Sequence, residues 1–181
     1  MNIRKTKIEG LLIFEPTVFK DNRGEFSVPF QEEIFKHNVS NKVQFVQDNE
    51  SVSRKGVVRG LHFQNPPYDQ GKLVRVVNGS AFDVAVDIRK NSSTYGEHVS
   101  LQLSAENKLI FWIPPGFAHG FLAQEENTIF SYKCTSFYNS ESEGNLLWND
   151  PDLNIDWPIS APLLSPKDSN AARFSTFASQ F

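Results

Sequence analysis

Short apolar runs, rich in Val, Ile and Phe, alternate with frequent turn residues along the whole chain. The most regular segment is KLVRVVNGSAFDVAVDIR, residues 72–89, in which Asn78-Gly79 separates two strand-like runs. Because Asn-Gly tolerates the positive φ angles of a type I′ turn, we expect a β-hairpin here. From Phe82 to Ile88 every second residue is apolar, which is typical of a strand with one apolar face.

Further strands are predicted at about Leu109–Ile113 and Thr128–Cys134. Helix is scarce: residues 30–38, FQEEIFKHN, have the spacing of one or two turns, and Ser165-Pro166 resembles a helix N-terminus. From about Asn139 the chain is dense in Asn, Asp, Pro and Trp, which indicates loop and coil packed over the strands. With no repeat and no linker, residues 1–181 are expected to form one all-β domain, a sandwich or barrel.

Composition narrows the possible functions. The 181 residues carry 18 basic and 21 acidic side chains, a net charge of −3, which argues against binding to a nucleic-acid backbone. The single cysteine, Cys134, excludes an internal disulfide and a multi-thiolate zinc site, and it fits a reducing compartment. The apolar patch Leu11–Phe14 is too short for a signal peptide or a membrane span. We therefore expect a cytoplasmic protein that binds neither membrane nor nucleic acid.

Four histidines are present. His37 and His98 have polar, turn-like neighbours and are expected on the surface. His62, in VVRGLHFQ, and His119, in WIPPGFAHGF, lie in strand-like runs. A lone strand histidine is more often a core residue than a catalytic one, so spacing alone favours the structural interpretation for both.

Metal binding is the first chemistry to test, because small cupin barrels often bind iron, manganese or zinc. Pro114-x-Gly116-x-x-His119 matches the second half of the cupin metal pattern, but Phe63-Gln64 follows His62 where the second histidine belongs. Two imidazoles without a nearby carboxylate make a poor transition-metal site. The pattern predicts a cupin shape without its metal.

Acid–base chemistry remains. A histidine acts as a base near neutral pH when a carboxylate orients its ring. Cys134 is interpreted as a buried structural thiol, because neighbouring strand residues such as Lys133 point to the opposite face. The candidate groups are His62 as base, Asp83, Asp87 or Asp168 as its carboxylate, Tyr132 as acid, and Lys72 or Arg59 as oxyanion stabiliser.

Taken together, these segments resemble the dTDP-4-dehydrorhamnose 3,5-epimerase family, whose members act on dTDP-4-keto-6-deoxy sugars. The resemblance runs in order from about Ile8 to Asp168. It rests on DNRGEF at 21–26, the block from FVQDNE to DIR at 45–89, STYGEHVSLQLSAEN at 93–107, WIPPGFAHGFL at 112–122, YKCTSFYNSESEGN at 132–145 and LWNDPDLNIDWP at 147–158.

The resemblance implies a cupin-like double-stranded β-helix (a jelly roll) that forms a homodimer, with the N-terminal arm crossing to the partner subunit. It also implies an isomerase of deoxysugar nucleotide biosynthesis, usually toward L-rhamnose for cell-envelope polysaccharide or lipopolysaccharide. The implied reaction converts dTDP-4-dehydro-6-deoxy-D-glucose to dTDP-4-dehydro-L-rhamnose. The hydrogens at C3 and C5 flank a carbonyl, so each can leave as a proton to give an enolate, and neither metal nor redox cofactor is needed.

Residue by residue, the resemblance assigns His62 as the base, Asp168 as the carboxylate that orients it, Lys72 as the cation near the enolate oxygen, and Tyr132 as the acid on the opposite face. Arg23 and Phe26 are expected to reach the site from the partner subunit. The positions implied to line the substrate are Arg23, Phe26, Gln47, Asn49, Arg59, His119 and Tyr138.

Some positions depart from the family pattern. Val28 stands where the family usually has a glutamate that holds the thymine ring, and Phe137 stands where tyrosine is frequent. SESEGN at 140–145 lacks the common arginine. Arg59 and His62 are three residues apart and face the same way only if the strand is bulged, which we expect at Gly60.

Three alternatives accompany the main hypothesis. The first is an epimerase that acts at C3 only or C5 only in another dTDP-4-keto-6-deoxy-sugar pathway. The second is a metal-dependent cupin oxygenase. The third is a sugar-nucleotide binder without turnover, against which the four expected catalytic residues argue.

Overall fold

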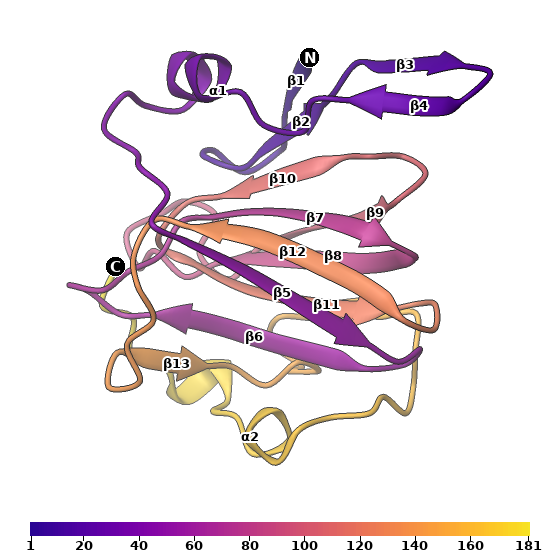
Figure 1. Ribbon diagram of the computed structural model, residues 1–181. Helices are drawn as coiled ribbons and strands as arrows, with labels where there is room; N and C mark the ends of the chain where they lie inside the picture. Colours follow the sequence, from indigo (N-terminus) through magenta and orange to yellow (C-terminus); the bar gives the residue numbers. More distant parts are fainter.

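The computed structural model describes residues 1–181 and consists mainly of two antiparallel sheets packed face to face (Figure 1). The first sheet has the strand order β1 (Asn2–Lys5), β2 (Leu12–Glu15), β10 (Ile110–Ile113), β7 (Lys72–Asn78), β12 (Thr128–Cys134) and β5 (Gln47–Ser53). The second has the order β13 (Glu143–Asn145), β6 (Val58–Gln64), β11 (Phe117–Ala123), β8 (Ser80–Asp87) and β9 (His98–Ser104). This arrangement confirms the predicted all-β jelly roll.

Helices are few and short, as predicted. They are α1 (Glu32–Asn38), α2 (Pro166–Ser169) and the 3₁₀ turn η1 (Phe174–Thr176). Helix α2 begins where the sequence indicated, because the Ser165 side chain accepts a hydrogen bond from the main-chain N–H of Asp168. None of the helices is long and apolar enough to span a membrane.

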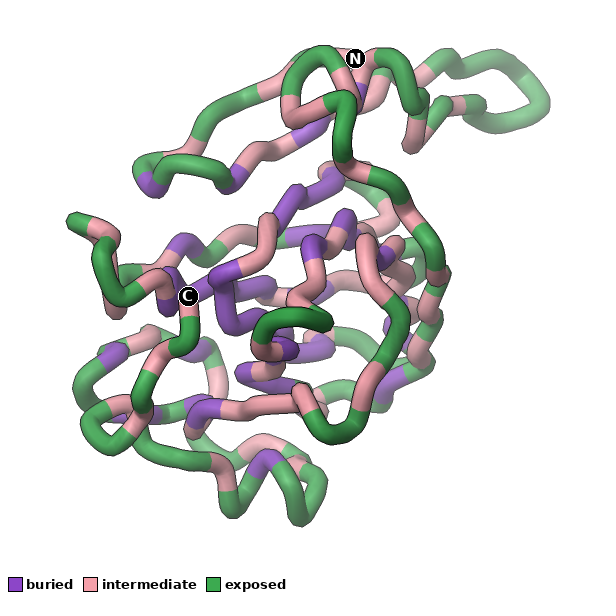
Figure 2. The backbone as a smooth tube through the Cα atoms, turned by 90° about the vertical axis from the view of Figure 1, so that its left-hand side faces the viewer, coloured by how far each residue is buried: buried purple, intermediate pink, exposed green.

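The main core fills the space between the two sheets, where the buried stretches gather in Figure 2. At its centre the rings of Phe121 and Phe130 stack with centroids 3.9 Å apart. Alternation along β7 continues the inward-facing row from Val76 and Val74 to Lys72. The interior therefore changes from apolar to polar at one end of the barrel, and the candidate site lies at that end.

Two further cores cover the outer faces of the sheets. Helix α1 places Phe35 against Trp112 on the first sheet. On the second sheet the C-terminal coil packs Trp148 and Trp157, with the Trp157 indole N–H donating to the main-chain O of Trp148 at 2.7 Å. The predicted coil after Asn139 is thus confirmed, except that the short strand β13 adds an edge to the sheet.

The predicted hairpin at Asn78-Gly79 is wrong. Strand β7 pairs with β10 and β12, whereas β8 pairs with β9 and β11, so the chain passes from one sheet to the other at Gly79. Val74 and Ala85 then face each other across the same core instead of lying side by side in one sheet. Asn-Gly specified a tight reversal, at Gly79 with φ +75°, but burial on both faces of β8 decided which strands pair.

The predicted bulge in β6 is confirmed. Arg59 lies opposite Phe121 and His62 opposite His119, so two residues of β6 stand against Gly120 alone. Gly60 has φ +135°, and a Cβ there would lie 2.5 Å from the Gly120 Cα. Glycine at both positions lets the backbones approach, and the bulge turns Arg59 and His62 to the same side.

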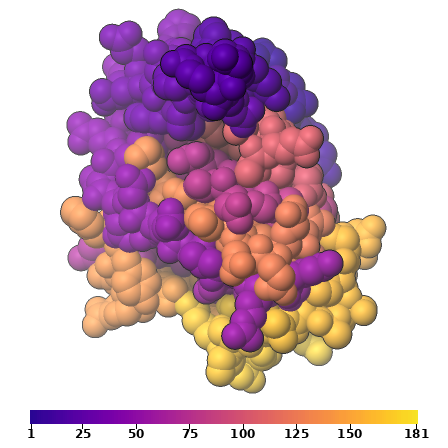
Figure 3. Space-filling model, turned by 45° about the vertical axis from the view of Figure 1, so that its right-hand side comes forward, coloured from indigo at the N-terminus to yellow at the C-terminus, as the bar shows by residue number.

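The N-terminal ribbon β3 (Val18–Asp21) and β4 (Gly24–Ser27) stands apart from both sheets. It extends beyond the barrel in Figure 1, and the indigo N-terminal part of the chain forms the top of the molecule in Figure 3. Phe19 and Phe26 on the ribbon are 62% and 63% exposed. The ribbon therefore presents two aromatic rings that this chain does not cover.

Candidate active site

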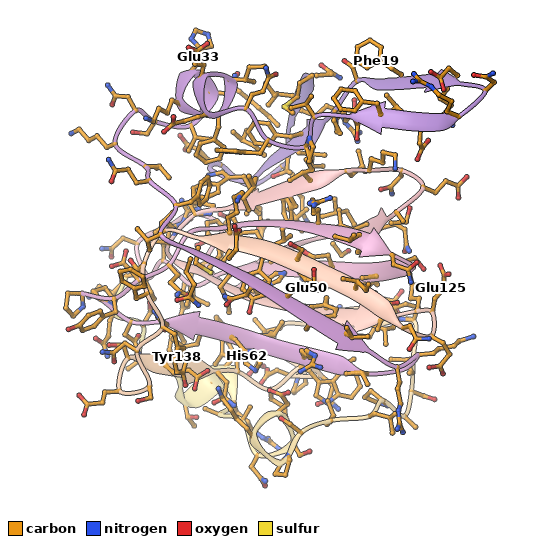
Figure 4. The ribbon with its side chains drawn as sticks, viewed as in Figure 1. Phe19, Glu33, Glu50, His62, Glu125 and Tyr138 are labelled. Atoms are coloured by element: carbon orange, nitrogen blue, oxygen red, sulfur yellow. The ribbon has the colours of Figure 1, made fainter.

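A cavity of about 360 Å³ opens between the polar ends of the two sheets. Its walls come from strands β5, β6, β7, β12 and β13 and from the loop that precedes β13. Figure 4 shows His62 on β6 and Tyr138 on that loop at the same end of the molecule. The lining residues are Gln47, Asn49, His62, Phe63, Gln64, Gln70, Lys72, Tyr132, Tyr138 and Glu143.

His62 is hydrogen-bonded to Asp168 at the cavity wall. Its Nε2 lies 2.5 Å from Asp168 Oδ1, and the Ser165 hydroxyl donates to the other carboxylate oxygen at 2.9 Å. Burial raises the pKa of Asp168, but the hydrogen bonds from His62 and Ser165 and the charge of His62 outweigh it and hold the pKa below the usual value. The carboxylate therefore stays ionised and stabilises an imidazolium at position 62.

Lys72 begins strand β7 and reaches into the same cavity. Its Nζ lies 3.5 Å from the main-chain O of His62 and forms no ion pair with a carboxylate. Burial lowers the pKa of Lys72, although the neighbouring Cys134 and Asp83 oppose the effect. An ammonium in this position is available to an oxyanion of a bound molecule.

Tyr132 lies on the inward face of β12, between Phe130 and Cys134. Burial raises the pKa of its phenol, so the group keeps its proton well above neutral pH. His62 and Tyr132 both line the cavity, from strands of opposite sheets. This places a base and a proton donor on the walls of one cavity.

Three glutamine side chains hold the loop that forms the remaining wall. The Gln47 oxygen accepts from the main-chain N–H of Tyr138 at 3.1 Å, and the Gln64 oxygen accepts from that of Asn139 at 2.8 Å. The Gln70 amide donates to the main-chain O of Ser136 at 2.7 Å. We call these three residues the amide clamp. It fixes the loop through main-chain atoms and leaves the Tyr138 ring exposed.

His119 and Arg59 lie beside the cavity. His119, opposite His62 on β11, is buried and bonds to Asp83 Oδ2 at 2.8 Å. Arg59 donates to the Ser53 hydroxyl at 3.1 Å, and its charge acts to lower the pKa of Tyr132, so it lies close to the phenol. Both residues therefore belong to the surroundings of the site.

Arg23 and Phe26 lie outside this chain's own cavity. Both are on the exposed ribbon, where the Arg23 guanidinium pairs with Asp21 at 2.5 Å. In Figure 4 Phe19 of the same ribbon stands far from His62. Within one chain, the structure does not bring these two predicted residues to the site.

The other candidates have structural roles or other positions. Asp87 accepts hydrogen bonds from Arg89, Ser92 and Thr94 and does not contact a histidine. Cys134 is fully buried, as predicted, and burial raises the pKa of its thiol.

His37 is exposed on α1, as predicted, but the surface prediction for His98 is wrong. His98 is half-buried in β9, and its pKa is lowered, first by burial and then by the charge of Lys7.

No three His, Cys, Asp or Glu side chains gather in a geometry suited to a metal ion. His62 bonds to Asp168 on helix α2, whereas His119 bonds to Asp83 on strand β8. The donor set of a cupin metal centre is therefore not assembled around either imidazole.

Sequence reasoning missed four residues of the cavity: Phe63, Gln64, Gln70 and Glu143. Gln64 follows His62 by two residues on β6, so strict alternation places it on the same inward face and was a usable signal. Glu143 bonds to Lys167 and accepts from the Tyr138 hydroxyl at 3.2 Å. It lies on a three-residue strand that no pattern indicated.

The fold and the site define a cupin-like barrel whose cavity carries an imidazole–carboxylate pair, a lysine and a phenol. These are the functional groups of an acid–base enzyme. The family model for dTDP-4-dehydrorhamnose 3,5-epimerase matches residues 5–176. A dTDP-4-dehydrorhamnose 3,5-epimerase from Shigella flexneri is 55% identical over 174 residues, covering 96% of each chain. This chain belongs to the dTDP-4-dehydrorhamnose 3,5-epimerase family.

Solved structures agree with this membership. A dTDP-6-deoxy-D-glucose-3,5-epimerase from Legionella pneumophila, in complex with dTDP-4-keto-L-rhamnose, superposes with a TM-score of 0.94 at 48% identity, covering 98% of this chain and 94% of that one. A 3′-monoepimerase from Streptomyces bikiniensis, in complex with dTDP-quinovose, superposes with a TM-score of 0.90 at 33% identity, covering 94% and 87%. The cupin-like fold is thereby confirmed.

Proposed function

We propose that this chain epimerises dTDP-4-dehydro-6-deoxy-D-glucose at C3 and C5 to dTDP-4-dehydro-L-rhamnose, in the cytoplasm. The observation that carries the proposal is the His62–Asp168 pair on the same cavity as Tyr132 and Lys72. The family membership supplies the substrate class. The unpaired Cys134 suits a reducing compartment.

The chemistry follows from the keto group at C4. His62 removes the proton next to the carbonyl, and the ionised Asp168 stabilises the resulting imidazolium. The electron pair of the broken C–H bond moves onto O4, where the Lys72 ammonium stabilises the enolate. Tyr132 then donates its proton to the opposite face of the same carbon, which inverts it. The sequence of steps is repeated at the second carbon and uses no metal or redox cofactor.

The remaining predicted residues are assigned to binding. Gln47, Asn49 and Tyr138 line the cavity, and His119 and Arg59 lie beside it. We assign these side chains to the sugar and the adjoining phosphates, because arginine pairs well with phosphate oxygens and amides bond to hydroxyls.

We further propose that the chain forms a homodimer in which each ribbon completes the partner's site. The exposure of Phe26 and the distance of Arg23 from this chain's own cavity support the proposal. The partner's ribbon then supplies an arginine for the diphosphate and an aromatic ring for the nucleotide. Residues 1–181 act in this proposal as one domain with a swapped arm.

Solvent exchange tests the catalytic proposal. Turnover of dTDP-4-dehydro-6-deoxy-D-glucose in deuterated water is expected to give product with deuterium at both C3 and C5, detected by NMR. A His62→Ala variant is expected to leave both hydrogens unexchanged. Product without deuterium, or exchange that persists in the variant, would refute the enolate route or the assigned base.

Epimerisation at a single carbon is the alternative, favoured by the similarity to the 3′-monoepimerase. Both activities need the same base and acid, so the four catalytic residues do not distinguish them. The number of deuterium atoms in each product molecule does: two for the double reaction and one for the single reaction.

A further inference from the structure

Three directed hydrogen bonds run along the cavity wall on strand β5. The main-chain N–H of Tyr138 donates to Gln47 Oε1 at 3.1 Å, and Gln47 Nε2 donates to Asn49 Oδ1 at 2.8 Å. Asn49 Nδ2 then donates to Cys134 Sγ at 3.4 Å. We call this series the amide relay.

The direction of the amide relay is set at its first member. A main-chain N–H can only donate, so the oxygen of Gln47 faces Tyr138 and its NH₂ faces Asn49. The oxygen of Asn49 is then taken by Gln47, and the NH₂ of Asn49 faces the other way. One of its two N–H groups meets the Cys134 sulfur, and the second remains for another acceptor.

A candidate acceptor is the phenol of Tyr132. Asn49 and Tyr132 are directly opposite each other on the paired strands β5 and β12, and both line the cavity. Directly opposite residues on one face of an antiparallel pair are in side-chain contact range. Although burial raises the pKa of Tyr132, a hydrogen bond from Asn49 acts in the opposite direction.

Resting on the proposed function, we propose that Asn49, in addition to lining the substrate, is a positioning residue: held by Gln47, it donates an N–H to the Tyr132 phenol oxygen and so turns the phenol proton toward the sugar. An oxygen that accepts on one side presents its own O–H elsewhere, and the open side is the cavity. When the O–H bond breaks and the new C–H bond forms, the enolate charge passes to the phenolate. The phenolate keeps the Asn49 donor until it regains a proton from solvent water.

Titration of the phenol in the free protein tests the proposal without substrate. Protein made with 3-fluorotyrosine, which ionises at lower pH than tyrosine, gives four ¹⁹F signals, because the chain has four tyrosines. A Tyr132→Phe variant assigns the relevant one. In Asn49→Leu the phenol is expected to ionise about one pH unit higher than in the wild type, because the phenolate loses a donor.

A matched control separates the amide relay from general disturbance of the wall. Gln64→Met breaks the bonds of Gln64 to the loop but leaves Gln47, Asn49 and Cys134 in place. Gln64→Met is expected to leave the Tyr132 titration unchanged. Gln47→Met frees the Asn49 amide and is expected to shift the Tyr132 titration by less than Asn49→Leu does. The charged or titratable groups that face the phenol are the same in all three variants: Arg59, His62, Lys72, Cys134 and Glu143.

Catalysis gives the second readout. In deuterated water, two quantities are measured: the deuterium incorporated into recovered substrate and the amount of inverted product. In Asn49→Leu the ratio of the first to the second is expected to rise at least tenfold, because the enolate forms but is reprotonated from the His62 side. A purely structural defect lowers exchange and inversion together. An unshifted Tyr132 titration in Asn49→Leu, or an unchanged ratio, overturns the positioning role. A wild type that neither exchanges nor inverts overturns the proposed function instead.

Discussion

At the scale of single residues, three of the four buried aspartates each bond to a different basic side chain. Asp168 bonds to His62, Asp83 to His119, and Asp87 to Arg89. The sequence left all three carboxylates as candidate partners of His62. In particular, alternation along one strand places Asp83 and Asp87 on the same face and does not distinguish them. The three-dimensional arrangement assigns each to a distinct task.

Replacing Asp168 by Asn is expected to lower kcat by about 10²–10⁴-fold, because the amide cannot stabilise an imidazolium at His62. Steady-state rates on the dTDP-keto sugar measure the effect. Asp156→Asn is the matched control, since Asp156 is exposed, and its rate is expected to equal that of the wild type. A rate for Asp168→Asn within threefold of the wild type would contradict the assigned pair.

Asp87 links stability to pH. Burial raises its pKa, but the hydrogen bonds from Arg89, Thr94 and Ser92 outweigh this and bring it from 3.8 to about 2. A depressed pKa stabilises the folded state above the unfolded-state value and loses that contribution as pH falls toward the folded-state value. Between pH 4 and pH 2 the free energy of unfolding should therefore lose about 2 kcal/mol from this group.

Urea unfolding of the wild type and of Asp87→Asn at a series of pH values checks this. The variant is expected to be less stable at pH 7 by about 2–4 kcal/mol, because an amide cannot accept all the bonds that Asp87 accepts. The gap should narrow as pH falls from 4 to 2. A gap that stays constant across this range would show that the Asp87 charge does not stabilise the fold.

At the scale of elements, the bulge in β6 decides which side chains reach the cavity. Without it Arg59 and His62 would face opposite sides of the sheet. Gly60 and Gly120 are in close contact where the two strands meet, and neither leaves room for a Cβ. A local backbone feature thus determines the position of the proposed base.

Gly60→Ala is expected to destabilise the fold by about 3–5 kcal/mol, because the new Cβ would meet the Gly120 backbone at 2.5 Å. Gly24→Ala on the ribbon is the matched control. Gly24 has a similar φ of +132°, but nothing lies within 4 Å of its Cβ position, so only backbone strain of about 1–3 kcal/mol remains. Equal shifts in the chemical-denaturation midpoint of the two variants would contradict the steric account.

The sequence predicted more of the elements than of their pairing. Alternation located β12, while helical spacing and the Ser165-Pro166 start signal located the two short helices. The three-residue separation of Arg59 and His62 located the bulge at Gly60. Asn78-Gly79 marked a reversal but not the change of sheet, because a turn motif carries no information about the far partner of either strand. The pairing of His62 with Asp168, 106 residues away, came from the family resemblance alone.

At the scale of the whole molecule, the ribbon β3–β4 is the part least explained by a single chain. Its two phenylalanines are exposed, and Glu25 bonds at 2.6 Å to Lys108, which lies between β9 and β10. Exposed aromatic rings of this kind are typical of interaction surfaces. The proposed exchange of ribbons between subunits gives them a partner.

Mixing two inactive variants tests this exchange. His62→Ala removes the base but keeps the ribbon, and Arg23→Ala impairs the ribbon but keeps the base. If ribbons act on the partner's site, subunits remixed from partial denaturation give hybrid dimers with one intact site, and about a quarter of wild-type activity returns. Activity no higher than the mean of the two parents would show that each ribbon serves its own chain or none.

The amide clamp has a consequence for how this enzyme can diversify. Gln47, Gln64 and Gln70 grip only backbone atoms of residues 136–139, and the rings of Phe137 and Tyr138 are 66% and 58% exposed. Replacing the side chain of residue 137 or 138 therefore breaks no clamp bond. The backbone of the loop keeps its position while the side chains that it presents can change. Substitution of Tyr138, which lines the cavity, can accordingly change which sugar is bound while the four catalytic side chains stay the same.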